Sequence, residues 1–209
     1  EGIAIRAGHH CAQLVMQRGL KVRLHLLIPA VENAIAGNAF RPGDVLRSRA
    51  GISVEIGNTD AEGRLVLGDA LTRAGEEAPE LVIDFATLTG AARVALGPDL
   101  PPLFTGHDAF ASDIAAAGHR VGDPVWRLPF WPGYEANIDS PIADMNNVSE
   151  APFAGAIIGA LFRQRFVKSA RRFAHFDIYG WRPTAKPLGP KGGEPQVARA
   201  LFELFRRPH

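Results

Sequence analysis

The chain has 209 residues, 46% of them apolar and 22% charged, which is the composition of a globular domain with a sizeable core. Its formal net charge of +1 gives no electrostatic case for binding nucleic acid or an anionic membrane, and no apolar stretch approaches the roughly 18 residues of a membrane span. The single cysteine, Cys11, cannot form an internal disulfide and favours a reducing, cytoplasmic location.

The beginning of the chain predicts a longer or processed protein. The first residue is Glu rather than Met, and a basic region followed by a hydrophobic one, as in a secretory signal, is not visible. The first predicted helix covers residues 8–18, and the alternation of basic and apolar residues over 21–28 predicts a strand. Residues 33–50, rich in Gly, Asn and Pro, indicate a loop.

Helices and strands alternate along the rest of the chain. The nearly continuous apolar run 81–86 predicts a strand buried on both faces, and Asp108 is a candidate N-cap of a helix over 108–118. The remaining predicted elements are strands at 54–56 and 173–178, helices at 65–75, 155–170 and 195–205, and an irregular loop at 182–195. This order predicts an α/β fold with a mixed β-sheet sandwiched between helices, in a single domain over residues 1–209.

Two carboxylates and a guanidinium fall within five residues at the junction of the strand 54–56 and the helix 65–75. Asp60 and Glu62 are separated by one residue, so on extended backbone their side chains project to the same side. Carboxylate oxygens suit divalent cations, and Arg64 adds positive charge at a helix start, where backbone N–H groups favour anions. The pattern indicates a metal-dependent hydrolytic site at the carboxyl end of a strand.

Other interpretations of the chemistry have less support. The junction that carries Asp60, Glu62 and Arg64 could be a capped turn between strand and helix, whose carboxylates are merely solvated. A histidine-bound zinc is disfavoured because His9 and His10 have no further ligand nearby, the other histidines are scattered, and no His-Glu-x-x-His pattern exists. A serine hydrolase would need a Gly-x-Ser-x-Gly elbow, which is absent from the sequence. Cys11 is disfavoured as a nucleophile because the sequence around it shows no general base.

Residues 58–65 read Asn-Thr-Asp-Ala-Glu-Gly-Arg-Leu, which is similar to the signature of the leucine aminopeptidase (cytosol aminopeptidase) family of two-metal peptidases. The resemblance extends from about Gln13 to the C-terminus. Further matching stretches are residues 29–33, 37–44, 86–91, 126–129, 143–147 and 175–178. The resemblance implies that the chain is the C-terminal portion of such a catalytic domain.

The resemblance also implies a role for each signature residue. Asp60 and Glu62 would be metal ligands for two divalent cations, Mn²⁺ or Zn²⁺, with Glu62 bridging the two ions. Arg64 would be the catalytic arginine, holding a bicarbonate ion that acts as general base.

A second matching segment, 87–90, follows the buried strand 81–86. By resemblance, the residues that line the substrate cleft and bind the peptide are Thr87, Leu88, Thr89 and Gly90. The alternative is structural, since either threonine can cap a helix. The other matching polar residues, Asp144, Asn146, Asn147 and Asp177, are interpreted as side chains that satisfy loop backbone.

The upstream part of the family pattern is missing. It would contain a metal-binding lysine, two metal-binding aspartates and a catalytic lysine, and residues 1–10 depart from it; Glu1 falls near the position of one aspartate. The chain thus holds two of the five protein ligands that the resemblance implies. We expect the 209-residue chain alone to be inactive and to bind metal weakly.

The function implied by the resemblance is a leucyl aminopeptidase, which hydrolyses N-terminal residues from peptides. The alternative, from another class, is a non-catalytic fragment or relative that keeps the fold for assembly. The resemblance further implies a homo-hexamer. The loops 182–195 and 101–107 are candidate contact or lid regions, although their composition favours ordinary surface loops.

Overall fold

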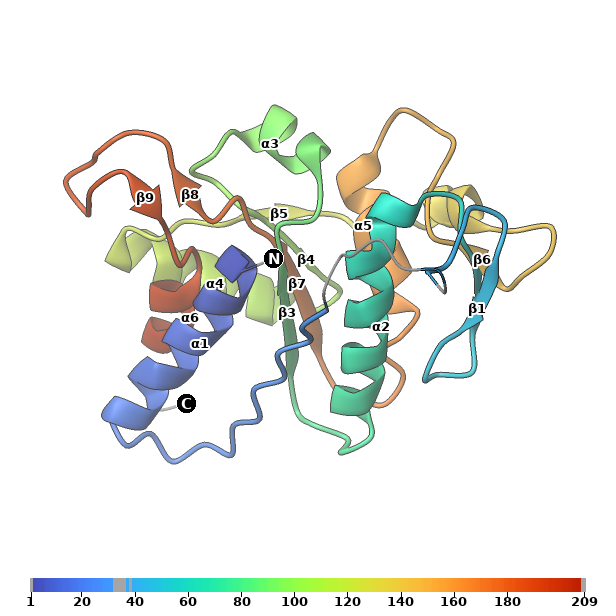
Figure 1. Ribbon diagram of the computed structural model, residues 1–209. Helices are drawn as coiled ribbons and strands as arrows, with labels where there is room; N and C mark the ends of the chain where they lie inside the picture. The colour runs from blue at the N-terminus through green and yellow to red at the C-terminus, as the bar shows by residue number, and fades with distance from the viewer. Residues whose placement is uncertain (1, 32–36, 38, 208–209) are drawn as a thin grey trace. The chain divides into compact units, whose positions relative to one another are not determined.

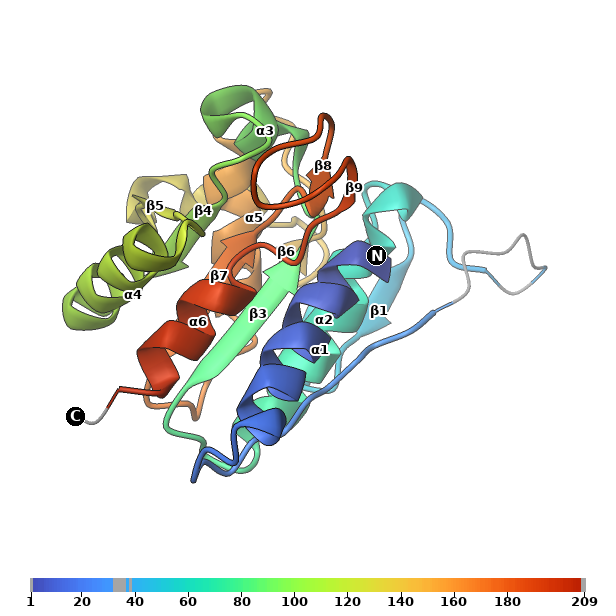
Figure 2. The same ribbon diagram turned by 90° about the vertical axis from the view of Figure 1, so that its left-hand side faces the viewer.

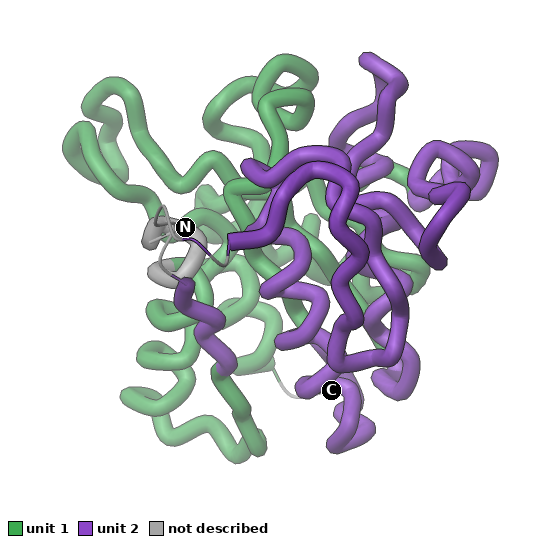
Figure 3. The backbone as a smooth tube through the Cα atoms, turned by 45° about the vertical axis from the view of Figure 1, so that its right-hand side comes forward, with its two compact units in different colours: residues 1–26, 83–129, 172–209 green, residues 27–82, 130–171 purple. Residues whose placement is uncertain are grey.

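The computed structural model describes residues 2–31, 37 and 39–207 (Figure 1). Glu1, the matching residues at 32 and 33, and His209 lie outside this range. The chain divides into two compact units (Figure 3). The first comprises residues 1–26, 83–129 and 172–209, and the second comprises residues 27–82 and 130–171.

The first unit is built on a four-stranded sheet with the order β3-β7-β4-β5. Its strands are β3 (Val82–Ala86), β4 (Pro102–Thr105), β5 (Trp126–Leu128) and β7 (Phe173–Asp177). The sheet is mixed, because β4 runs antiparallel to β7 and parallel to β5. Every residue of β4 and β7 is buried, so the two central strands form the core.

Three helices pack along one face of this sheet: α1 (Gly2–Gln17), α4 (Asp108–Val121) and α6 (Ala198–Phe205) (Figure 2). The start of α6 is fixed by Asp123, whose carboxylate accepts hydrogen bonds from the backbone N–H groups of Val197, Arg199 and Ala200. Cys11 is buried in α1, and burial raises the pKa of its thiol to about 11. The unit also contains α3 (Gly90–Leu96) and an antiparallel pair of short strands, β8 (Trp181–Arg182) and β9 (Gly192–Gly193).

The second unit contains a three-stranded sheet with the order β1-β2-β6. Its strands are β1 (Val45–Arg47), β2 (Ser53–Glu55) and β6 (Met145–Asn146), and its helices are η1 (Thr59–Ala61), α2 (Glu62–Gly75), η2 (Pro132–Ile138) and α5 (Gly155–Gln164). β2 pairs antiparallel with β1 and parallel with β6, which places buried Val54 opposite buried Met145. Gly68 of α2 lies against Phe166, where an added Cβ would come within 3.0 Å of the ring.

The predicted α/β class with a mixed sheet and packed helices is confirmed, but the strand predicted at 21–28 is wrong. These residues belong to no strand, and Val22, Leu24 and Ile28 are each more than two-fifths exposed. A strand needs a neighbouring backbone to pair with, and an alternating pattern cannot supply that partner.

Two local predictions also need correction. The segment 101–107 is not a surface loop, since it contains the buried strand β4. Asp108 is not the N-cap of α4; His107 occupies that position, and the side chain of Asp108 is 89% exposed and pairs with Arg127 at 2.7 Å.

Within the described residues, no helix combines the length and the apolar character that crossing a membrane requires.

Candidate functional site

The two signature carboxylates lie on helical rather than extended backbone. Asp60 is in the short helix η1, and Glu62 begins α2. The side chain of Asn58 caps η1, because its Oδ1 accepts a hydrogen bond from the backbone N–H of Asp60 at 2.9 Å. The expectation that Asp60 and Glu62 share one side of a strand is therefore wrong, since residues two apart in a helix do not face the same side.

The carboxylate of Glu62 has an unsatisfied buried oxygen. Its Oε2 atom is buried and has no hydrogen-bond partner in the described part of the chain, while Asp60 is exposed. A buried carboxylate oxygen without a donor is costly, and a bound cation would remove that cost. Among residues 2–31, 37 and 39–207, no group of three or more His, Cys, Asp or Glu side chains gathers to hold a metal. The donor chemistry therefore fits a divalent cation, but further ligands are needed.

The guanidinium of Arg64 is fixed two residues into α2. Its Nη1 donates a hydrogen bond to the backbone oxygen of Asn147 at 2.6 Å. Its guanidinium carbon also lies 5.6 Å from the centre of the Phe162 ring, a cation–π distance. A positive charge is thus held at the start of a helix, where backbone N–H groups also favour an anion.

Asn147, which is fully buried, connects this region to the end of β6. Its Oδ1 accepts hydrogen bonds from the backbone N–H groups of Gly57 (2.8 Å) and Asn58 (3.2 Å), and its Nδ2 donates to the oxygen of Asn58 at 2.8 Å. As predicted, the amide satisfies loop backbone. The sequence did not reveal which loop, because the partners lie 89 and 90 residues away along the chain.

The segment 87–90 belongs to the first unit, where it connects β3 to α3. The carboxylate of buried Asp177 fixes it: Oδ1 accepts hydrogen bonds from the N–H groups of Leu88 (2.9 Å) and Thr89 (3.2 Å), and Oδ2 accepts from the Thr89 hydroxyl (2.5 Å). The same hydroxyl accepts from the N–H of Ala92 at 3.1 Å, so Thr89 caps α3, as the structural alternative for this segment proposed.

The structure therefore groups the sequence-predicted residues in two sets. Asp60, Glu62 and Arg64 share one turn in the second unit, and the segment 87–90 forms a loop in the first. The sequence interpretation that Asn147 and Asp177 satisfy loop backbone is confirmed, but it did not identify the backbone segments that they bind. Asp177 ends β7, a strand that the sequence predicts, whereas Asn147 follows β6, which has only two residues and gives no sequence pattern.

Several known proteins are similar in sequence to this chain. Residues 2–202 match the catalytic domain of the cytosol aminopeptidase family. A probable cytosol aminopeptidase from Chlorobium limicola is 43% identical over 196 residues, which are 93% of this chain and 39% of that protein. A probable cytosol aminopeptidase from Xanthomonas oryzae pv. oryzae is 47% identical over 176 residues, covering 84% of this chain and 36% of the relative.

Solved structures give the same result. The crystal structure of a cytosol aminopeptidase from Coxiella burnetii matches 93% of this chain and 43% of its own, with a TM-score of 0.88 and 50% identity. The bottromycin maturation enzyme BotP in complex with Mn matches 81% of this chain and 38% of its own, with a TM-score of 0.76 and 40% identity. The chain thus spans about two-fifths of the length of the relatives it matches. It belongs to the cytosol aminopeptidase family.

Proposed function

We propose that this chain provides part of the catalytic centre of a leucyl aminopeptidase, which hydrolyses N-terminal residues from peptides with two divalent cations. The observation that carries the proposal is the single turn that holds the unsatisfied Glu62 carboxylate and the fixed Arg64 guanidinium two residues apart. Membership of the cytosol aminopeptidase family supports the same reaction.

Asp60 and Glu62 are the proposed metal ligands, and the cations are Mn²⁺ or Zn²⁺. Carboxylate oxygens suit both ions, and the related BotP structure is a complex with Mn, which supports the first. Bound divalent cations in such sites polarise a carbonyl oxygen and lower the pKa of bound water. The two carboxylates of this chain supply negative charge and orient the site, and the remaining ligands come from elsewhere in the protein.

Arg64 is the proposed catalytic residue. Its fixed guanidinium, together with the N–H groups at the start of α2, forms a positively charged position suited to a small oxyanion such as bicarbonate. A bicarbonate held there is the proposed general base, which would accept a proton from the attacking water.

The segment 87–90 is the proposed binding site for the peptide main chain, through Thr87, Leu88, Thr89 and Gly90. The N–H groups of Leu88 and Thr89 already donate to Asp177, so a substrate would be bound by the other backbone groups of this loop. The hydrogen bonds to Asp177 also restrain the loop before a substrate arrives, which reduces the entropy lost on binding.

We also propose that the protein acts in the cytoplasm as a homo-hexamer. The names of its relatives, cytosol aminopeptidases, support the location. Exposed Trp131, Ile142 and Phe153 in the second unit provide apolar surface that a subunit contact would cover. Multi-angle light scattering of the full-length gene product tests the assembly, and a monomer at micromolar concentration would contradict it.

The activity is tested by leucine-amide hydrolysis with added Mn²⁺, using the full-length gene product that contains this sequence. Replacing both carboxylates (Asp60→Asn with Glu62→Gln) should lower kcat by more than about 100-fold, since losing a metal ligand costs more than losing an outer partner. The matched control, Asp69→Asn with Glu77→Gln, makes the same chemical changes in and just after α2 and should retain activity. Full activity of the Asp60/Glu62 variant would refute the site assignment.

A further inference from the structure

We infer that Asn147 is a positioning residue that sets the distance between the Arg64 guanidinium and residues 57–62, the carboxylate turn; the inference rests on the proposed function. Asn147 holds both ends of the signature. Its side-chain amide binds the backbone of Gly57 and Asn58, just before the carboxylates, and its backbone oxygen receives the Arg64 guanidinium. One residue, on a different segment of the chain, therefore joins the start of the turn to the catalytic side chain.

The hydrogen-bonding capacity of the Asn147 amide is specific to this task. Oδ1 accepts hydrogen bonds from two successive N–H groups, and Nδ2 donates one to the oxygen of Asn58. The amide therefore binds both backbone donors and a backbone acceptor of the same peptide segment. A carboxylate of the same size could accept but could not donate, and a methyl group could do neither. Neither replacement can hold the turn as an asparagine does.

Asn147 has little freedom to move. Its own N–H donates to the oxygen of Glu55 at 2.9 Å, which continues the pairing of β2 with β6 by one residue. The side chains on either side of Asn147 pack closely against Gly57, where an added Cβ would lie 2.4 Å from the Cγ2 of Val148. The backbone hydrogen bond to Glu55 and this packing restrain the position of the Asn147 oxygen relative to β2, and with it the position of the Arg64 guanidinium.

The test is a double-mutant cycle between Asn147 and Arg64 in the full-length gene product, measured as kcat and KM for leucine amide. Asn147→Ala should lower kcat about 10–100-fold with KM changed less than about twofold, as expected for loss of an interaction needed mainly in the transition state. In an Arg64→Ala background, the same substitution should lower kcat less than about threefold further, because its effect is transmitted through Arg64.

Asn146→Ala is the matched control. It removes the hydrogen bond that the N–H of Val148 donates to Asn146, but none of the hydrogen bonds that hold residues 57 and 58, and it should retain wild-type kcat. If Asn147→Ala does not fold, Asn147→Asp keeps the size of the side chain and should show the same loss of kcat.

Three results are distinguishable. Multiplicative losses in the double variant, or an unchanged kcat per folded molecule in Asn147→Ala, would overturn the positioning role. A wild-type kcat in Arg64→Ala would instead refute the catalytic role proposed for Arg64, and the inference would fall with it. A loss of kcat confined to variants that retain Arg64 would support the inference.

Discussion

At the scale of single residues, the two parts of the candidate site are held in the same way. A polar side chain at or just beyond the end of a strand accepts hydrogen bonds from two successive backbone N–H groups of the adjoining loop. Asn147 does this for residues 57 and 58, and Asp177 does it for residues 88 and 89. Both side chains are buried, so each bond replaces one that water would otherwise make.

Gly57, at the start of the carboxylate turn, has little space for a side chain. A Cβ at this position would lie 2.4 Å from the Cγ2 of Val148 and 2.7 Å from the Oδ1 of Asn146. We expect Gly57→Ala to lower the free energy of unfolding by about 1–3 kcal/mol, since overpacking forces neighbouring segments apart. Urea denaturation followed by circular dichroism measures this change.

Gly106→Ala is the control for that substitution, because nothing lies within 4 Å of an added Cβ there. Equal stability of the two alanine variants would contradict the close packing between the turn and the segment after β6. Leucine-amide turnover should also fall in Gly57→Ala alone, because the displaced segment carries the Asn147 oxygen that binds Arg64.

How far the site could be predicted depended on the distance between partners along the chain. The Asn58 cap and the helix start at Glu62 are local, and the signature between residues 58 and 64 indicated a site there. The positioning contacts join residues more than 80 positions apart, and no local pattern encodes them. The carboxylate geometry was predicted wrongly because a one-turn helix was taken for extended backbone.

At the scale of elements, the strands β3 and β7 were located within one residue, although β3 is not buried on both faces as predicted, since its residues alternate between buried and half-buried. The fully buried strand β4 was taken for a loop; it begins at Pro102, directly after Pro101. The short strands β5 and β6 carry too few residues to show a period. The alternating segment 21–28 shows the reverse error, since a strand-like pattern has no pairing partner there.

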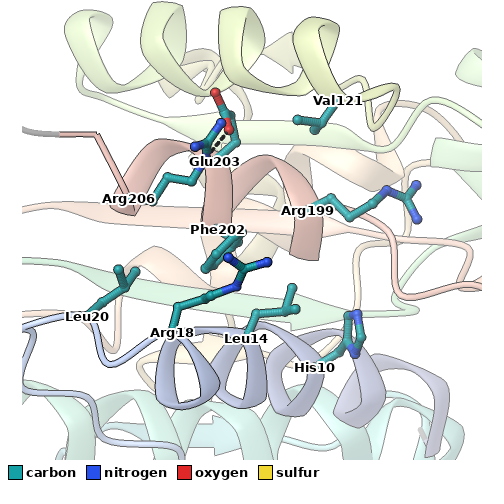
Figure 4. Close-up of a pocket in the computed structure, with 9 residues that line it drawn as sticks. All are labelled: His10, Leu14, Arg18, Leu20, Val121, Arg199, Phe202, Glu203 and Arg206. Atoms are coloured by element: carbon teal, nitrogen blue, oxygen red, sulfur yellow. Dashed lines mark hydrogen bonds and ion pairs between the residues drawn. The ribbon is translucent and has the colours of Figure 1, made fainter.

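Helix α6 ends in a cluster of charges around Glu203, whose side chain is 4% exposed. Arg206, Arg207 and Arg120 donate to its carboxylate, and these hydrogen bonds, that of Arg206 first, hold the pKa of Glu203 below its usual value. Glu203 also lines a pocket of about 670 Å³ between α1 and α6, shown in Figure 4.

A lowered pKa means that Glu203 stabilises the fold above its unfolded pKa of about 4.3, and that this contribution is lost as pH falls through the folded pKa. We therefore expect Glu203→Gln to lower the melting temperature at pH 7 and to change it less at about pH 3, where the carboxylate of the unfolded chain is already protonated and part of this contribution is lost. Thermal unfolding followed by circular dichroism at both pH values measures the difference.

Glu80→Gln is the control, because Glu80 forms an exposed pair with Arg171 and such pairs contribute little. A loss of stability in Glu203→Gln that is the same at both pH values would indicate a packing effect and contradict the electrostatic one.

At the scale of the whole molecule, both compact units are assembled from separate stretches of sequence. The first unit takes three stretches and the second takes two. No contiguous piece of sequence therefore forms either unit alone. The carboxylate turn belongs to the second unit and the segment 87–90 to the first. Contacts between distant residues must form before either part of the site is complete, which favours slow folding.

The 209-residue chain alone should bind Mn²⁺ weakly and lack leucine-amide turnover. Asp60 and Glu62 are two ligands where the family resemblance implies five, and no cluster of three ligands occurs in the described residues. Calorimetric titration and turnover should be compared with a longer version that includes the upstream lysine–aspartate segment. Equal affinity and rate would contradict this prediction and direct attention to Glu1, which lies outside the described residues.

The buried thiol in α1 has a practical consequence for spectroscopy. Cys11 is the one cysteine of the sequence, and a pKa of about 11 leaves only ~10⁻⁴ of it as thiolate at neutral pH. Maleimide reagents should therefore react very slowly with Cys11 and label cysteines that are introduced at exposed positions. Met16 (76% exposed) and Ile142 (60% exposed) belong to different compact units, so a nitroxide pair at Met16→Cys and Ile142→Cys would report the separation of those units by pulsed electron resonance.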